Sequence, residues 1–392
     1  MALALDHVAR PLVPAARVRR ISLQDFRSYA ALDLAVDAPL VALTGENGAG
    51  KTNILEALSF LCPGRGLRRA ELADVARLGG PGGWAVSAII DAAMDEPVRL
   101  GTGLERAEGG LLQRRNRVDR EPAASAAAFA DWVRLVWLTP ELDGLFRGPP
   151  GERRRFLDRL VLAVDAEHAA RGSRFDRALR GRNRLLQDPG SDARWLDAIE
   201  HEVAEHGVAL AAARLETVRR LRGVVEDTRD DASPFPWAAL ELRGELESAL
   251  ALAPALDVED SYRAALREAR DRDRVAGRAL MGPQTSDLSV VHGPKGVAAA
   301  GASTGEQKAL LVGLVLAHAR LVWAMCAQRP LVLLDEVAAH LDPRRRAALY
   351  EALSALDCQV WMTGADPALF SDLPAGSATF RVVPGGVEPL AR

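Results

Sequence analysis

The residues Gly45-Glu46-Asn47-Gly48-Ala49-Gly50-Lys51-Thr52 decide the fold, because they fit the pattern G-x-x-x-x-G-K-[ST]. An apolar segment precedes them at 39–44 and a helical pattern follows at 52–61, so we expect a strand, a loop and a helix. Glycines in such a loop let backbone N–H groups approach phosphate oxygens, and Lys51 adds a positive charge. A chance glycine-rich turn is the alternative. The pattern predicts an α/β fold with a phosphate-binding loop, called the P-loop below.

A second apolar segment, Leu331-Val332-Leu333-Leu334-Asp335-Glu336, is typical of a buried strand that ends in two carboxylates. In a P-loop ATPase, Asp335 and the hydroxyl of Thr52 would hold Mg²⁺. Glu336 would orient or deprotonate the attacking water and is the candidate catalytic residue. A strand capped by surface acids is the alternative, but the P-loop in the same chain favours the metal site.

Ser303-Thr304-Gly305-Glu306-Gln307-Lys308 opens a long apolar helix ahead of this strand, so backbone N–H groups and the helix dipole would face an anion. The segment is similar to the signature motif of ABC-type ATPases, which binds the γ-phosphate held by the other subunit. Residues 339–342 are similar to the D-loop of that class, with Asp342 in place but alanine where serine is usual. Each motif is short, but their order along the chain favours the ABC-type class.

The spacing of these motifs predicts an inserted domain. Asp335 lies 283 residues after Thr52, although both would meet at one magnesium ion. The chain changes to long charged helices at 146–274, where an apolar stripe recurs at helical spacing: Leu196, Ile199, Val203, Leu210, Val218, Leu221 and Val225. We expect an N-terminal ATPase half at 1–145, with a Q-loop-like segment at 134–141. A helical insertion at 146–274 and a C-terminal ATPase half at 275–392 would follow.

Composition restricts the class of protein further. The chain has 392 residues, 48% hydrophobic and 26% charged, with a net charge of −3, so a nucleic acid would be bound by local patches. Only Lys51, Lys295 and Lys308 are lysines among the 50 basic residues, and no role for Lys295 follows from its position. The three scattered cysteines favour neither a disulfide framework nor a zinc site.

Two segments could be mistaken for membrane or export signals. Residues 1–16 contain charged side chains where a signal peptide needs an apolar core, so we interpret them as a loose extension. Residues 309–327 approach membrane-spanning length but include His318 and Arg320, which favours a buried helix.

The chain resembles the RecF family of bacterial recombination mediators over nearly its whole length. The resemblance rests on Asp25-Phe26-Arg27-Ser28-Tyr29, on GENGAGKTNILEAL with the trailing GRGLRRA, and on TPELDGLFRGPPGERRRFLDRLV at 139–161. GASTGEQKALL and LLDEVAAHLDPRRRAAL complete it. One segment departs from the family: residues 282–287 are Gly-Pro-Gln-Thr-Ser-Asp where G-P-H-R-D-D is common. We therefore assign no role to Gln284 or Thr285.

The resemblance implies an ABC-type, SMC-like P-loop ATPase head with an inserted, mostly helical second lobe. It implies two head-to-tail subunits that close on ATP, bind double-stranded DNA and single-strand/double-strand junctions, and help RecO and RecR to load RecA. Weak, DNA-stimulated ATP hydrolysis would release the cytoplasmic, nucleoid-associated dimer. The ATP contacts would come from the P-loop with Asn53, and from Arg27, Ser303, Gly305, Gln307, Lys308 and Asp342.

Arginine clusters are candidates for sequence-independent binding of the DNA backbone. Six arginines between 171 and 184 oppose only Asp176. A solvated helix face in an arginine-rich protein is the alternative for each cluster. The predicted DNA-binding residues are Arg65, Arg68, Arg69, Arg153, Arg154, Arg171, Arg174, Arg177, Arg180 and Arg184.

Three other classes fit less well. An ABC transporter subunit would carry a histidine after the strand that follows the acidic one, where this chain has Thr363. An SMC-like chromosome-associated ATPase, the main alternative, would carry a much longer coiled-coil insertion. An ATPase fused to a nuclease would need more chain after Asp342.

Overall fold

The segments that carry the P-loop and the acidic strand end meet in one sheet of the computed structural model, which describes residues 16–91, 96–107 and 110–390. Five strands are parallel, and the last strand, β15, is antiparallel to β14. The carboxyl ends of parallel strands share an edge, so the residues after β3 and after β12 come together. The sheet order is β15 (Gly386–Pro389), β14 (Ala378–Val383), β3 (Leu40–Thr44), β13 (Val360–Gly364), β12 (Leu331–Leu334) and β8 (Leu135–Leu138).

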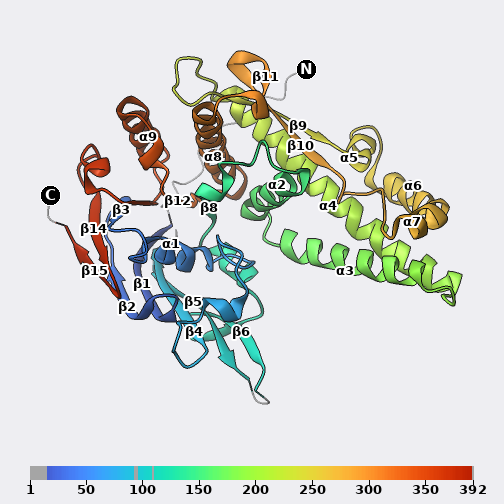
Figure 1. Cartoon of the computed structure of the whole chain (residues 1–392), viewed down its shortest axis with the longest axis horizontal. Coiled ribbons are helices and arrows are strands. Elements are labelled where there is room, and N and C mark those ends of the chain that lie inside the picture. The colour runs from blue at the N-terminus through green and yellow to red at the C-terminus, as the bar shows by residue number, and fades with distance from the viewer. Residues whose placement is uncertain (1–15, 92–95, 108–109, 391–392) are drawn as a thin grey trace. The chain divides into compact units, whose positions relative to one another are not determined.

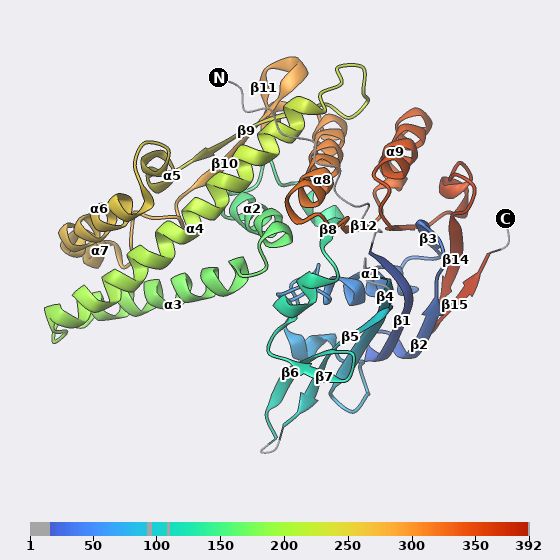
Figure 2. The same cartoon turned by 180° about the vertical axis from the view of Figure 1, so that it is seen from behind.

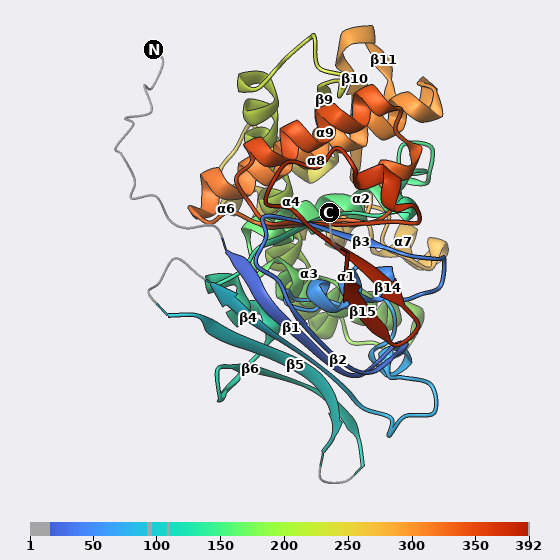
Figure 3. The same cartoon turned by 90° about the vertical axis from the view of Figure 1, so that its left-hand side faces the viewer.

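A second, antiparallel sheet forms the curved layer visible in Figure 3. Its strands alternate between buried and exposed residues, as a half-buried sheet requires. The order is β2 (Tyr29–Ala35), β1 (Arg17–Phe26), β4 (Trp84–Asp91), β5 (Val98–Arg106), β6 (Leu112–Val118) and β7 (Glu121–Ala123).

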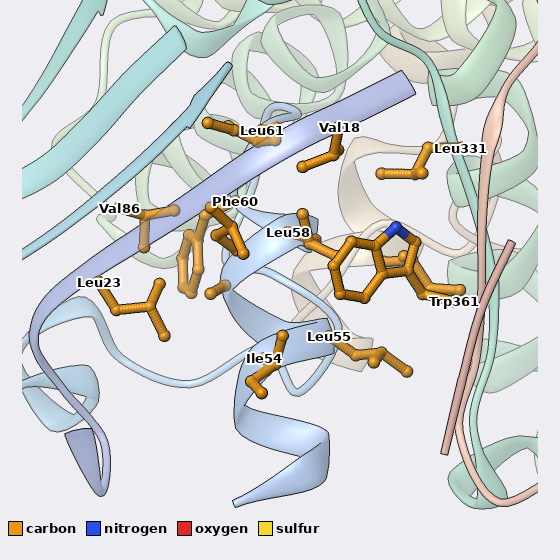
Figure 4. Packing of buried hydrophobic residues seen from close by; sticks show 14 of the residues in the cluster. Val18, Leu23, Ile54, Leu55, Leu58, Phe60, Leu61, Val86, Leu331 and Trp361 are labelled. Atoms are coloured by element: carbon orange, nitrogen blue, oxygen red, sulfur yellow. The ribbon is translucent and has the colours of Figure 1, made fainter. Parts of the chain in front are cut away.

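Helix α1 (Lys51–Ser59) lies in the core between these two sheets. Its buried side chains contact Leu23 and Val86 of the antiparallel sheet and Leu331 and Trp361 of the parallel sheet (Figure 4). Most of the helix is buried, and the polar residues Lys51, Glu56 and Ser59 are buried together with its apolar side chains. The core therefore fixes the helix whose first residues belong to the P-loop.

The buried amide of Gln359 joins the two sheets by hydrogen bonds. Its Oε1 accepts from the backbone N–H of Val18 at 2.9 Å and from Trp361 Nε1 at 3.1 Å. Its Nε2 donates to the carbonyls of Val18 at 3.2 Å and Ala38 at 3.1 Å. All the hydrogen-bonding capacity of the side chain is used, so the polar group is accommodated inside the core.

The contacts divide the chain into two units, and the boundaries differ from those expected at 145/146 and 274/275. Unit 1 comprises Met1–Pro140 and Ala319–Arg392, and unit 2 comprises Glu141–His318. Residues 275–318 group with the insertion because β10 (Asp287–His292) pairs with β9 (Ala238–Arg243). Of the predicted N-terminal extension, residues 1–15 lie outside the described residues.

Unit 2 is mostly helical, as expected, and the long helices α3 and α4 pack against each other (Figures 1 and 2). The predicted stripe on α4 is buried, apart from the half-buried Ile199. The unit contains a sheet in the order β11 (Val297–Ala298), β10, β9. Its helices are α2 (Pro150–Val164), α3 (His168–Gln187), α4 (Ala193–Asp227), α5 (Glu245–Leu250), α6 (Ala255–Glu268) and α7 (Arg270–Ala276).

Two expectations about strands were wrong. Strand β9 lies inside the segment expected to be helical, because pairing with β10 overrides the helical preference of its Ala, Leu and Glu residues. The second concerns the chain after β13, for which the sequence predicts no further strand, although β14 and β15 follow there. Strand β14 pairs with β3, a partner so distant in sequence that short-range patterns give no sign of it.

The long apolar segment forms α8 (Thr304–Cys326), as expected, and α9 (Pro343–Ala355) follows β12. Helix α8 is long and apolar enough to cross a membrane, but 67% of its most apolar window is buried inside the protein. A core helix passes the same test of length and composition, and its buried residues favour that interpretation.

His318 of α8 makes stability depend on pH. Burial lowers the pKa of His318 to about 4, although its bond to the Leu160 carbonyl at 2.9 Å opposes the shift. Between pH 6.5 and 4 the unfolded chain binds a proton that the native chain does not, so the free energy of unfolding falls as pH falls. Urea unfolding at pH 7.5 and 4.5 should show about 2 to 3 kcal/mol less acid destabilisation for His318→Gln than for the parent.

The exposed His201 of α4 provides the control. His201→Gln should keep the full acid sensitivity of the parent. Equal pH dependence of the parent and His318→Gln would contradict a neutral His318.

Candidate nucleotide site

Three glycines of the P-loop have a positive φ, and at two of them a side chain would also collide with neighbouring atoms. Gly45 has φ 145° and Gly50 has φ 114°, a region that favours glycine. A Cβ would lie 2.4 Å from the Val382 carbonyl oxygen at Gly45, and 2.6 Å from Tyr29 Oη at Gly50. At Gly48, φ is 86° and a Cβ would meet nothing within 4 Å. The loop is therefore packed at both ends and open in the middle, where the exposed Glu46 and Asn47 precede Gly48.

Lys51 is buried at the start of α1, and its ammonium group curls back over the loop. Nζ donates to the carbonyls of Gly45 at 2.7 Å and Glu46 at 2.9 Å. Burial lowers the pKa of Lys51, and the carboxylates of Glu336 and Asp335 oppose that shift. The charge thus lies near both acidic residues of the strand end.

Asp335 brings the two halves of unit 1 together. Thr52 Oγ1 donates to Asp335 Oδ1 at 2.9 Å, with Oδ2 at 3.2 Å, and Thr363 Oγ1 donates to Oδ1 at 2.7 Å. The backbone N–H of Glu336 donates to Thr363 Oγ1 at 2.9 Å. A hydroxyl and a carboxylate in contact form an all-oxygen donor set, which suits Mg²⁺. Thr363 was not predicted to belong to this site, because in the sequence it is notable only as the residue that stands where a histidine is absent.

Arg27 and Asn53, both predicted to contact ATP, belong to a polar network beside α1. The guanidinium of Arg27 forms two hydrogen bonds to the fully buried carboxylate of Glu56, at 2.8 and 2.6 Å. Arg68 donates to Glu56 at 3.1 Å and to Asn53 Oδ1 at 2.8 Å. Asn53 in turn donates to Ser28 Oγ at 2.9 Å. These contacts fix both predicted residues next to the P-loop.

The signature segment lies in unit 2, where Ser303, Thr304 and Gly305 are exposed. Glu306 accepts from the backbone N–H of Ser303 at 3.0 Å, and Ser303 Oγ accepts from the N–H of Glu306 at 3.4 Å. This reciprocal arrangement is a capping box at the start of α8. Lys295 donates to Glu306, which lowers the pKa of that carboxyl to about 2.

Gln307 and Lys308 have contacts within unit 2 that differ from the predicted ATP contacts. Gln307 is buried and donates to the carbonyls of Ala300 at 3.3 Å and Ala302 at 2.8 Å, and Arg147 donates to the same two carbonyls. Lys308 pairs with Asp143 at 3.1 Å. These bonds hold the turn from behind, so the exposed surface of the signature is Ser303 to Gly305.

The D-loop residue Asp342 caps helix α9. Its side chain accepts from the backbone N–H of Arg345 at 3.0 Å, and this bond lowers the pKa of the carboxyl. The carboxylate also faces the positive end of the helix dipole. Asp342 is therefore held in place in unit 1, at the end of the segment that leaves β12.

The predicted DNA-binding arginines separate into paired and exposed groups. Arg65 pairs with Glu71, Arg68 pairs with Glu56, and Arg171 pairs with Asp165 at 2.8 Å. Arg69 has φ 55° in the turn that follows. Among the described residues, no ion pair involves the exposed side chains of Arg174, Arg177, Arg180 and Arg184 on α3.

Those four arginines share one face of α3. Positions 174, 177, 180 and 184 fall within about 120° of each other at 100° per residue, opposite the buried Phe175, Ala178 and Leu186. Arg182, in the same run, is fully buried and bonds to Glu200 at 3.0 Å and Asp273 at 2.7 Å. We call the four exposed residues the α3 arginine face.

Arg153 and Arg154 contact the segment that departs from the resemblance, and this weighs against their predicted role in DNA binding. Arg153 bonds to both carboxylate oxygens of Asp287, at 2.7 and 2.9 Å, and Arg154 donates to the Ser286 carbonyl at 2.7 Å. Gln284 and Thr285 bond to carbonyls of their own turn, at Met281 and Gly282.

The sheets, the P-loop and the carboxylate-bearing strand end define an ABC-type P-loop ATPase head, the class that includes SMC heads. A family model described as AAA domain matches residues 20–77. The Smc head domain of Pyrococcus furiosus aligns with a TM-score of 0.52 and 15% identity, over 96% of each chain. A structure described as the recombination mediator protein RecF-ATP in the RecFOR pathway aligns with a TM-score of 0.82 and 19% identity, over 98% of this chain and 100% of that chain.

Sequence comparison gives the family. The chain is 53% identical to the DNA replication and repair protein RecF of Mesorhizobium japonicum, over 94% of this chain and 96% of that protein. It is 49% identical to the RecF of Brucella abortus, over 98% of each chain. The chain belongs to the RecF family of DNA replication and repair proteins.

The capping box of α8 can be tested by a local measurement. Glu306→Ala removes the acceptor of the Ser303 N–H and the partner of Lys295, so we expect faster amide hydrogen exchange at residues 303–307. The loss of overall stability should be small, because only a contact at one helix end is removed. Glu351→Ala on the exposed side of α9 is the control. Unchanged exchange at 303–307 would show that the box contributes nothing.

Proposed function

We propose that the chain is an ATP-controlled DNA clamp. Two copies close head to tail on ATP, bind duplex DNA at single-strand/double-strand junctions, and act with RecO and RecR to load RecA in the cytoplasm. ATP hydrolysis, weak and stimulated by DNA, opens the dimer. Membership of the RecF family supports the role in repair, and the similar RecF-ATP structure supports the binding of ATP.

The observation that carries the proposal is the contact between Thr52 and Asp335. A P-loop threonine and a strand-end aspartate 283 residues apart lie 2.9 Å from each other. Such a pair would hold Mg²⁺, which neutralises phosphate charge during phosphoryl transfer. Lys51 would exchange its carbonyl partners for phosphate oxygens, and Glu336 would orient the attacking water.

The signature segment supports dimerisation. In ABC-type ATPases this segment contacts the nucleotide that is bound by the other subunit. Ser303 to Gly305 are exposed at the start of a 23-residue helix, so their N–H groups and the helix dipole can receive a phosphate. ATP would then be buried by two chains, and binding energy would favour the dimer.

Lys51→Arg should spare folding but weaken ATP-dependent dimerisation by about tenfold or more, because a planar guanidinium cannot replace the compact ammonium group. The measurement is light scattering after size exclusion, with and without ATP and gapped DNA. ATP-dependent dimers of undiminished stability would contradict the role of Lys51.

A second variant makes this experiment specific for head-to-tail closure. Ser303→Arg blocks the signature but leaves the P-loop intact, so it should also be monomeric with ATP. An equal mixture of Lys51→Arg and Ser303→Arg restores one complete site and should recover part of the dimer. No recovery in the mixture would argue against two shared sites.

The α3 arginine face is the proposed DNA contact. It presents four guanidinium groups on one side of a 20-residue helix, and the aromatic residues needed for base stacking do not accompany them. Such a face suits phosphate contacts with duplex DNA, without reading of sequence.

Arg174→Glu/Arg177→Glu should weaken duplex binding and reduce the slope of log K against log salt by about 2, since two phosphate contacts are lost. Arg219→Glu/Arg220→Glu on α4 changes the net charge equally, at exposed residues that pair with Glu216, and is the control. An unaltered salt slope in the α3 variant would remove this face from the DNA interface.

A further inference from the structure

Thr363 lies in β13, the strand between β3, which leads into the P-loop, and β12, which ends in Asp335 and Glu336. It is fully buried in β13, paired in register with Leu43 of β3, and β12 lies on the other side of β13. A buried hydroxyl needs partners, and those of Thr363 are both residues of the acidic strand end. Thr363 therefore touches the proposed metal ligand and the proposed catalytic residue at once.

The hydrogen-bond direction at Thr363 is determined by chemistry. A carboxylate only accepts and a backbone N–H only donates, so the single hydroxyl proton of Thr363 goes to Asp335. Its lone pair receives the N–H of Glu336 at 2.9 Å. Thr363 thus connects Asp335 and Glu336 in one fixed arrangement.

Both hydroxyl groups use the same oxygen of Asp335. Oδ1 accepts from Thr363 at 2.7 Å and from Thr52 at 2.9 Å, whereas the only hydrogen bond to Oδ2 from the described residues is the longer contact to Thr52 at 3.2 Å. Two lone pairs of Oδ1 are then occupied, and Oδ2 keeps acceptor capacity for a cation or its bound water. Without Thr363, the carboxylate would be held by Thr52 alone and could rotate.

The hydrogen bond from the Glu336 N–H to Thr363 stabilises a backbone conformation that is rare for a residue with a side chain. The φ of Glu336 is 53°, in the left-handed region that residues with a side chain rarely adopt. The N–H of Asp335 still bonds to the Leu138 carbonyl of β8, at 2.9 Å, whereas the N–H of Glu336 bonds to a side chain instead of a neighbouring strand. The hydroxyl of Thr363 receives that N–H at the point where the chain turns.

We infer that Thr363 is a positioning residue, which aligns the Asp335 carboxylate for Mg²⁺ and holds the turn that carries Glu336. This inference rests on the proposed ATPase function. It also gives a reason for threonine where ABC transporters have histidine: the position supplies a short hydroxyl to the carboxylate.

The experiment measures nucleotide affinity in EDTA and over a Mg²⁺ titration, with a fluorescent ATP analogue. Thr363→Val has nearly the same volume but no hydroxyl, so affinity in EDTA should stay within about threefold of the parent. The Mg²⁺ concentration at half-effect should rise by about tenfold or more, as for other partners of metal ligands. Thr363→Ser keeps the hydroxyl and should restore the parental Mg²⁺ response.

Thr102→Val is the control for loss of a buried hydroxyl in the same unit, where Thr102 donates to Asn116 at 2.9 Å. It should leave the Mg²⁺ response unchanged. If Thr363→Val fails to fold, Thr363→Cys makes the same comparison, because its thiol is a weak donor.

The outcomes separate the two claims. A parental Mg²⁺ response in Thr363→Val, or an equal loss of affinity with and without Mg²⁺, would overturn the positioning role. A parent chain that binds the nucleotide no better with Mg²⁺ than with EDTA would overturn the proposed ATPase function, and the positioning role with it.

Discussion

The two hydroxyl bonds to Asp335 impose the constraint on which unit 1 depends, because they require β3, β13 and β12 to end side by side. Parallel strands cannot be joined by a tight turn, so the chain must cross over between them. Between β3 and β12 it forms α1, most of the antiparallel sheet, β8 and the whole of unit 2. The site is therefore assembled from both ends of the chain, and neither segment of unit 1 contains it alone.

The sequence predicts features that depend on neighbouring residues, but it does not predict features that depend on contacts between distant segments. The P-loop was predictable because Gly45 and Gly50 have positive φ angles, and these belong to the conformation of a short loop. The role of Thr363 was not predictable, because it depends on the pairing of β13 with β3 and β12, which are distant in the sequence. The same reason applies to β9 and β14, whose partners β10 and β3 are distant in the chain.

The arginines show where composition misleads. Residues 171–184 form one charged run in the sequence, yet Arg182 is buried beside Glu200 and Asp273, while Arg184 is exposed. Their difference depends on which side of α3 packs against α4, and a charged side chain gives no sign of it. Buried guanidinium groups are tolerated because their carboxylate partners are buried with them. Only the unburied side of the helix can contribute to an external electrostatic field.

All three lysines lie at the P-loop or beside the signature segment. Lys51 bonds to the P-loop carbonyls, whereas Lys308 and Lys295 neutralise carboxylates beside the signature, at Asp143 and Glu306. A bare carboxylate at Glu306 would oppose an incoming phosphate at the same helix end where the N–H groups attract it. Because Lys295 pairs with Glu306, the capping box can stabilise the first turn of α8 while its charge is offset. Lys295 therefore allows an acidic helix cap beside the backbone N–H groups that we propose to bind a phosphate.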